Sequence, residues 1–178
     1  MTTWMVRSGS GGRLADECRE KGVVALGWEH TGDPDRFGGK GELQQAIVTA
    51  YPDYTEGQAA SAASQLWRFK NELAPGDYVI TYDSGARLYH YGVINGDARY
   101  DASAVEELAF QRPVKWFDKP IRRDDLSSDA RNRLGSVLTL FKVPNLTAAE
   151  LHSLATGQGE AAQQESSDLE EPSDVFAA

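Results

Sequence analysis

The chain has 178 residues, of which 40% are hydrophobic and 25% charged, a composition that fits one globular domain with a single core. It contains no run of 18 apolar residues, which argues against a transmembrane helix. The one cysteine, Cys18, has no partner in the chain for a disulfide, so we expect a reducing, cytoplasmic setting.

The formal net charge of −9 is unevenly distributed. Residues 158–178 contain six acidic residues and no Lys or Arg, which leaves 21 acidic and 18 basic residues, a charge of −3, in residues 1–157. The same segment is rich in Gln, Ser and Glu and buries too little apolar surface to offset its chain entropy. We therefore expect a domain at 1–157 and an acidic disordered linker or tail at 158–178.

The first third of the chain alternates strand and helix patterns. Residues 3–9 predict a strand that runs into the glycine-rich segment SGSGG at 8–12. Residues 13–21 place apolar side chains at helical spacing, and Gly22 is a typical residue just after a helix end. Residues 23–28 form a near-continuous apolar run, which indicates a buried strand.

Two helices and a hairpin are predicted next. Residues 42–50 have helical spacing, and Pro52 in the following YPDYTEG segment ends that helix. Residues 57–73 carry the clearest apolar stripe of the chain. The segment APGD then turns the chain into two strands, 77–83 and 87–95, whose short connection indicates a β-hairpin.

The remaining elements are short. Residues 110–117 predict a strand, residues 124–133 a helix or long turn, and residues 136–143 another strand. Residues 147–155 predict a helix whose N-cap is Thr147. Because several strands are neighbours in sequence, the pattern favours an α+β fold with an antiparallel sheet or small barrel.

Familiar catalytic and metal-binding patterns are not found. His30, His90 and His152 do not fall into an HExxH motif or any zinc-ligand spacing, and there is no CxxC motif. Cys18 lies on the inner face of a predicted helix and is expected in the core. The SGSGG segment resembles a phosphate-binding loop in composition only, so we interpret it as a turn. We expect no catalytic residue, metal or cofactor.

Aromatic residues are the more informative feature. Trp28 ends an apolar strand just before a polar loop, Trp67 lies at the border of a helical stripe, and Tyr82 closes a strand. Such rings either complete the core or sandwich a planar ligand such as a base taken out of its stack. Cations near them would suit phosphates or would be ordinary surface charges: Arg7, Arg68, Lys70, Arg87, Arg112 and Lys115.

The order of motifs resembles a known superfamily. WMVRSG is followed by GVVALGW, AASQLWRFKNELAPGDYVITYDSGARLYHYGVINGD, RPVKWF and LGSVLTLFKV. This series, over about residues 3–143, is similar to the PUA-like superfamily of EVE, YTH and ASCH domains, and most to the amino-terminal module of Mrr-like modification-dependent restriction endonucleases. The resemblance implies a small curved antiparallel β-barrel flanked by helices that holds a modified base in an aromatic cage.

The resemblance also implies a set of pocket residues. Trp28 in GW matches the cage tryptophan of YTH domains, and Tyr82 in ITYDS matches the end of the pocket strand of EVE domains. A second cage aromatic is absent from the RPVKW strand unless Trp116 serves. A polar side chain would disfavour the unmodified base. The expected base-binding pocket therefore comprises Trp28, Ser64, Gln65, Trp67, Tyr82, Asp83, Ser84 and Trp116.

The function implied by the resemblance is that of a DNA-binding sensor. It would read a flipped, modified base, most simply a methylated one, and direct a restriction nuclease domain that lies outside this chain. The sequence leaves open which modification is read and whether DNA or RNA is bound. One alternative is a protein-interaction or oligomerisation module of a defence system, with the aromatics on a dimer face. Another is a glycosylase-like enzyme, for which Asp83 is the only candidate acid.

Overall fold

A computed structural model of the protein describes residues 1–104 and 107–157, so the predicted tail at 158–178 lies outside the described residues. The centre of the fold is a β-sheet in the order β2-β6-β4-β3-β1-β8, with β5 paired to β6 and β7 paired to β4. The strands are β1 Thr3–Val6, β2 Val23–Leu26, β3 Tyr78–Asp83, β4 Leu88–Ile94, β5 Arg99–Tyr100, β6 Phe110–Trp116, β7 Ile121–Arg122 and β8 Leu140–Lys142.

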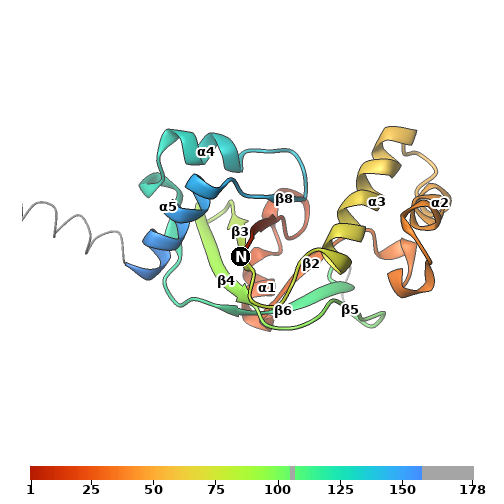
Figure 1. The fold of residues 1–178 in the computed structure, drawn as a ribbon, viewed down its shortest axis with the longest axis horizontal. Coiled ribbons are helices and arrows are strands. Elements are labelled where there is room, and N and C mark those ends of the chain that lie inside the picture. The colour runs from red at the N-terminus through yellow and green to blue at the C-terminus, as the bar shows by residue number, and fades with distance from the viewer. Residues whose placement is uncertain (105–106, 158–178) are drawn as a thin grey trace, which may run out of the picture.

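Helices flank this sheet in two pairs. The α2 and α3 helices lie together at one end of the molecule, and α4 and α5 lie together at the other, with the strands between them (Figure 1). Within the described ranges, no helix combines the length and the apolar character that crossing a membrane requires. The helices are α1 Ala15–Lys21, α2 Lys40–Ala50, α3 Glu56–Asn71, α4 Ser128–Leu134 and α5 Asn145–Thr156.

The sheet is mixed, which corrects the expected antiparallel barrel. β1 runs parallel to β3, with Thr3 opposite Tyr78, and antiparallel to β8, with Val6 opposite Leu140. Parallel neighbours need a long connection, and the chain supplies one because three helices and β2 lie between β1 and β3. The sheet curls into a half-barrel, and the described pairings do not join its end strands β2 and β8 to each other.

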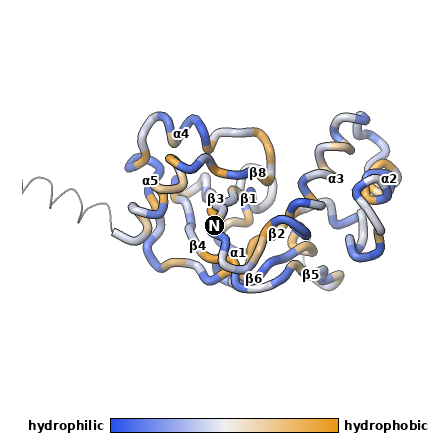
Figure 2. Tube along the Cα trace, viewed as in Figure 1, coloured by the Kyte–Doolittle hydropathy of each residue, from blue (hydrophilic) through white to orange (hydrophobic). Residues whose placement is uncertain are grey.

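The two faces of the sheet bury separate hydrophobic cores. Trp4 and Val79 belong to the core under α2 and α3, whereas their neighbours Met5 and Ile80 belong to the core under α4 and α5. This division follows from the two-residue repeat of a strand, which sends successive side chains to opposite faces. The short β2 is buried along its whole length and is coloured as hydrophobic in Figure 2.

Local signals place several elements close to where the sequence predicts them. The α1 helix ends at Gly22, which has the left-handed conformation of a C-cap, as expected. The α3 helix begins with a capping box in which Thr55 and Gln58 exchange side-chain and backbone hydrogen bonds. The β3–β4 hairpin is also confirmed, with Asp83 opposite Leu88 at its end.

Other boundaries differ from the prediction. The first strand stops at Val6 rather than at residue 9, and the strand expected at 136–143 is reduced to Leu140–Lys142. The last helix begins at Asn145, with Pro144 rather than Thr147 at the N-cap position. Thr147 is instead buried inside the helix, so its hydroxyl does not cap the helix end.

The glycine-rich loop after β1 imposes a tight contact on the fold. Gly11 and Gly12 both have a positive φ, of 66° and 77°, but only Gly12 lies against another part of the chain. A Cβ at Gly12 would overlap the carbonyl oxygen of Tyr82, whereas a Cβ at Gly11 would meet nothing within 4 Å. The loop can therefore pack on β3 only if residue 12 has no side chain.

We expect Gly12→Ala to destabilise the fold more than Gly11→Ala does. Both substitutions place an alanine in the left-handed region, at a cost of roughly 1–2 kcal/mol. Gly12→Ala also forces the loop away from β3, which adds about 1–3 kcal/mol, as overpacking does. Urea unfolding of the two variants measures the difference, and equal free energies of unfolding would contradict the contact.

Candidate functional site

An open cleft of about 740 Å³ lies between segments that are far apart in sequence. Its size is within the roughly 300–1,000 Å³ of small-molecule sites. Residues 9–11 after β1 form one part of the wall, and residues 27–30 after β2 form another. Tyr51 and Tyr54, between α2 and α3, and residues 135–137 and 139 before β8 complete most of the remainder.

A row of aromatic rings forms one wall of the cleft. The Nε1 of Trp28 donates a hydrogen bond of 3.1 Å to the hydroxyl of Tyr54. The rings of Tyr51 and Tyr54 are stacked with centroids 5.0 Å apart, and the His30 ring lies 5.9 Å from that of Tyr51. The backbone N–H of His30 donates to the Tyr51 hydroxyl at 3.2 Å. These contacts fix the orientation of the rings, which gives a planar ligand a preformed surface.

The backbone of Trp28 adopts a conformation that disfavours a bulky residue. Its φ of 60° and ψ of 36° lie in the left-handed region, where an L-residue costs roughly 1–2 kcal/mol. Strained residues of this kind cluster at ligand and catalytic sites, where the surrounding structure holds them in place. In this backbone conformation the indole of Trp28 reaches the hydroxyl of Tyr54 and donates its hydrogen bond to it.

Other residues of the cleft lining are polar and carry both charges. Arg7 donates from Nε to the carbonyl oxygen of Leu138 at 3.2 Å and from Nη2 to that of Ser136. Arg7 thereby holds the segment before β8 at the edge of the cleft. The carboxylates of Glu29 and Glu107 also line the cleft, and Glu107 forms an ion pair with Arg13. The cleft is therefore not a simple anion site.

The structure separates Trp28 from the other expected cage aromatics. Tyr82 stacks on Tyr89, with centroids 4.5 Å apart, at the core under α4 and α5. The Nε1 of Trp116 donates to the backbone oxygen of Cys18 at 3.3 Å, and Trp67 packs against the edge of the other core. Among the described residues that line the cleft, Trp28 is the one member of the expected pocket.

The expected polar residues of the pocket support neighbouring elements instead. Gln65 is buried on α3, and its Oε1 accepts a hydrogen bond of 2.9 Å from the backbone N–H of Leu140, which fixes the start of β8. Ser84 donates from Oγ to the backbone oxygen of Gly11 at 2.9 Å and so supports the cleft loop from behind. Ser64 lies half-buried on the same helix as Gln65, outside the cleft lining.

Arg112 has a structural role that corrects its expected contact with a nucleic-acid backbone. It is buried, and its guanidinium donates to the backbone oxygens of Phe69, Lys70 and Gly96 at 2.8–3.0 Å. These bonds join the end of α3 to β6, so the side chain faces inward. Of the six expected cations, only Arg7 lines the cleft within the described ranges.

The other expected cations lie elsewhere on the surface. Lys115 is exposed on β6. The remaining three form ion pairs: Arg68 with Glu72, Lys70 with Asp35, and Arg87 with Asp124.

Tyr51, Tyr54 and His30 are functional candidates that the sequence analysis does not select. The sequence contains a signal that could have identified the two tyrosines. They flank a helix break at Pro52, in a polar segment where core aromatics are not expected. The pairing of this segment with Trp28 depends on how α2 and α3 dock on the sheet, which no local pattern reveals.

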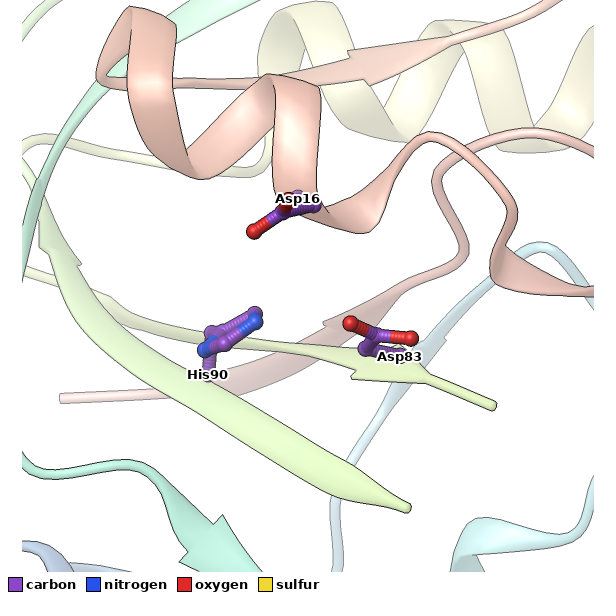
Figure 3. A group of neighbouring side chains, drawn as sticks. All are labelled: Asp16, Asp83 and His90. Carbon is purple, nitrogen blue, oxygen red and sulfur yellow. The ribbon is translucent and has the colours of Figure 1, made fainter. Parts of the chain in front are cut away.

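A second group of side chains lies apart from the cleft lining. Asp16, Asp83 and His90 each offer a potential metal-ligand atom, and these atoms lie within 4.8 Å of one another (Figure 3). Burial lowers the pKa of the His90 imidazole below its usual value. Because Asp83 belongs to this group, it does not supply the acid inside the aromatic pocket that a glycosylase-like enzyme would need.

The strain at Trp28 predicts different stabilities for two variants that lose the same indole. Trp28→Ala keeps the left-handed backbone cost, whereas Trp28→Gly removes it because glycine adopts positive φ freely. We expect Trp28→Gly to be more stable than Trp28→Ala by about 1 kcal/mol. Thermal and urea unfolding measure this difference. A more stable alanine variant would show that residue 28 does not hold this backbone conformation in solution.

Comparisons with known proteins identify the family of the chain. No curated protein matches it. A solved structure, protein Atu2648 from Agrobacterium tumefaciens, is 14% identical and aligns over 87% of this chain and 93% of that one. Its TM-score of 0.42 is too low to support an argument about the fold or the site. A family model described as a domain of unknown function, DUF8426, matches residues 4–141, and the chain therefore belongs to this family.

Proposed function

We propose that this protein binds DNA and recognises a modified base that is flipped out of the duplex into the cleft beside Trp28. The observation that carries the proposal is the row of oriented rings, Trp28, Tyr54, Tyr51 and His30, along one wall of an open cleft. Aromatic faces of this kind stack on bases with little regard to their sequence. Such a wall suits a base that has left the helix.

Stacking supplies affinity, and a smaller effect must supply the preference for a modified base. Flipping costs a few kcal/mol, and stacking on an aromatic side chain returns about 1–3 kcal/mol per base. Burial of one additional methyl group contributes about 0.8 kcal/mol, which corresponds to roughly a fourfold preference. Stronger discrimination therefore requires polar groups placed against the edge of the base.

The lining of the cleft offers such groups. Glu29 lines the cleft next to Trp28, and a carboxylate accepts hydrogen bonds from the exocyclic amino group of cytosine or adenine. Gly9, Gly11 and Gly27 also line the cleft, and their lack of side chains lets a planar ligand approach the backbone closely. This chemistry favours a modified cytosine or adenine over a modified thymine or uracil.

The charge of the domain limits the contribution of phosphate contacts. Residues 1–157 carry a net charge of −3, and Arg7 is the one expected cation in the described cleft lining. Salt-dependent binding scales with the number of phosphates neutralised, so few such contacts mean weak binding to any sequence. The base in the cleft must then dominate affinity, as a sensor requires. The idea that such a sensor directs a nuclease domain rests on the resemblance to restriction endonuclease modules.

One observation favours the alternative of a protein-interaction module. Val137, at the edge of the cleft, is 95% exposed, and Leu138 beside it is 39% exposed. Exposed apolar residues next to a cleft are also found where a second protein docks. A self-associating chain whose dimer is broken by Val137→Glu would favour this alternative over the sensor.

The proposal is tested by fluorescence anisotropy with the full chain and duplexes that differ in one base. The duplexes contain 5-methylcytosine, 5-hydroxymethylcytosine, N6-methyladenine or no modification. We expect at least a fivefold preference for one modified duplex. Trp28→Ala removes that preference, because the flipped base loses its stacking partner. Glu29→Gln weakens binding to that duplex while leaving the rings in place, because a neutral amide oxygen accepts a weaker hydrogen bond from the exocyclic amino group than a carboxylate does.

Trp67→Phe is the matched control, because Trp67 is a half-buried tryptophan outside the cleft lining. This variant keeps the preference of the wild type if the cleft is the binding site. Equal weak binding to all four duplexes, unchanged by Trp28→Ala, would overturn the sensor proposal. Circular dichroism of each variant separates lost recognition from lost folding.

A further inference from the structure

Three potential metal ligands converge from separate elements. Asp16 belongs to the first turn of α1, Asp83 ends β3, and His90 lies in the middle of β4. In the hairpin, His90 is opposite Thr81, so Asp83, two residues further along β3, shares its face of the sheet. The α1 helix packs against β3 on this face and brings Asp16 above the pair, so the side chains surround a common space (Figure 3).

His90 is the unusual member of this group. Its side chain is buried, with 3% of the residue exposed. In the described part of the chain, neither Nδ1 nor Nε2 has a hydrogen-bond partner. A neutral imidazole has one donor and one acceptor nitrogen, and burying either without a partner is costly. The ring thus presents an unused lone pair in a buried position beside two carboxylates, which is what a cation requires.

We propose that Asp16, Asp83 and His90 bind a divalent transition-metal ion, Zn²⁺ or Mn²⁺. One imidazole nitrogen and two carboxylate oxygens form a ligand set typical of these ions, whereas Mg²⁺ and Ca²⁺ prefer oxygen alone. This inference does not rest on the proposed base recognition, because none of the three residues lines the described cleft.

The geometry requires a modest contraction on binding. The ligand atoms lie within 4.8 Å of one another, whereas bonds of about 2.0–2.1 Å in a tetrahedral site hold them roughly 3.3 Å apart. Asp16 is exposed and can move toward the other two. Asp83 is more constrained, since its Oδ1 accepts a hydrogen bond of 3.2 Å from the backbone N–H of Ala86. With three protein ligands, a coordination position stays open to water on the exposed side of Asp16.

The two carboxylates of the group favour a cation, whereas the positive charge of Arg19 nearby opposes one. Two carboxylates balance the charge of a divalent ion. The nearby guanidinium of Arg19 donates from Nη2 to the backbone oxygen of Asp118 at 3.1 Å. Burial of the ring lowers the pKa of His90 and the charge of Arg19 lowers it further, whereas Asp83 and Asp16 raise it. The proposal itself rests on the geometry of the three side chains and on the missing hydrogen-bond partners of the ring among the described residues. A bound ion would join α1 to the β3–β4 hairpin, so it should also raise the melting temperature.

The test is isothermal titration calorimetry of the untagged full chain after treatment with chelator. Zn²⁺ and Mn²⁺ are the probes, with Mg²⁺ and Ca²⁺ at the same concentrations for comparison. We expect one equivalent of Zn²⁺ or Mn²⁺ to bind and to raise the melting temperature. Asp16→Asn and Asp83→Asn each weaken this binding at least tenfold, and Asp83→Asn retains an Oδ1 acceptor for Ala86.

Glu20→Gln is the matched control, because Glu20 is an exposed acid on the same helix outside the cluster. Its binding stays at the wild-type level if the site is the proposed one. Ring-nitrogen NMR gives a second readout, in which Zn²⁺ shifts His90 rather than His30 or His152. The proposal is overturned by the absence of binding, by binding that neither aspartate substitution weakens, or by a titration that moves a different histidine.

Discussion

The parallel pairing of β1 with β3 is the constraint on which both candidate sites depend. It places the end of β1 beside the end of β3, although the helices α1, α2 and α3 lie between these strands in sequence. The loop at residues 8–12 must then pass directly over β3, and Gly12 makes this possible at Tyr82. One side of the loop lines the cleft, and its continuation starts α1, which carries Asp16. A shift in this pairing would displace both groups of side chains.

The positions of the helices and strands could be predicted from the sequence better than the contacts between them, and the reason is physical. Apolar periodicity and the Gly22 helix end are local signals that the sequence analysis used, and both agree with the helices of the structure. The Thr55 capping box is also a local signal, although the sequence analysis did not use it. The parallel contact of β1 and β3 and the docking of α2 and α3 are set by the packing of distant segments. For that reason the sequence indicated Trp28 as a ligand-facing ring but not its neighbours Tyr51 and Tyr54.

The difference between local signals and long-range contacts also explains why the sequence analysis did not find the candidate metal site. Once the hairpin register is known, the shared face of Asp83 and His90 follows from strand periodicity. The third residue, Asp16, joins them only because α1 folds back over β3. A search for metal-ligand spacing considers residues within one short motif. It therefore does not detect three ligands at positions 16, 83 and 90. Tyr82 and Trp116, expected in one pocket with Trp28, instead contact Tyr89 and the backbone oxygen of Cys18, outside the described cleft lining.

The cleft and the candidate metal site share no residue among those described, but one turn connects them. Asp83 belongs to the candidate metal site, and its neighbour Ser84 donates a hydrogen bond to Gly11, which lines the cleft. A substitution at Asp83 can therefore change the cleft by moving this turn, even if no ligand passes between the sites. Asp16 lies on α1 and has no such bond to the cleft loop among those described. An effect on base recognition shared by Asp16→Asn and Asp83→Asn would thus point to the ion, whereas an effect of Asp83→Asn alone would point to the turn.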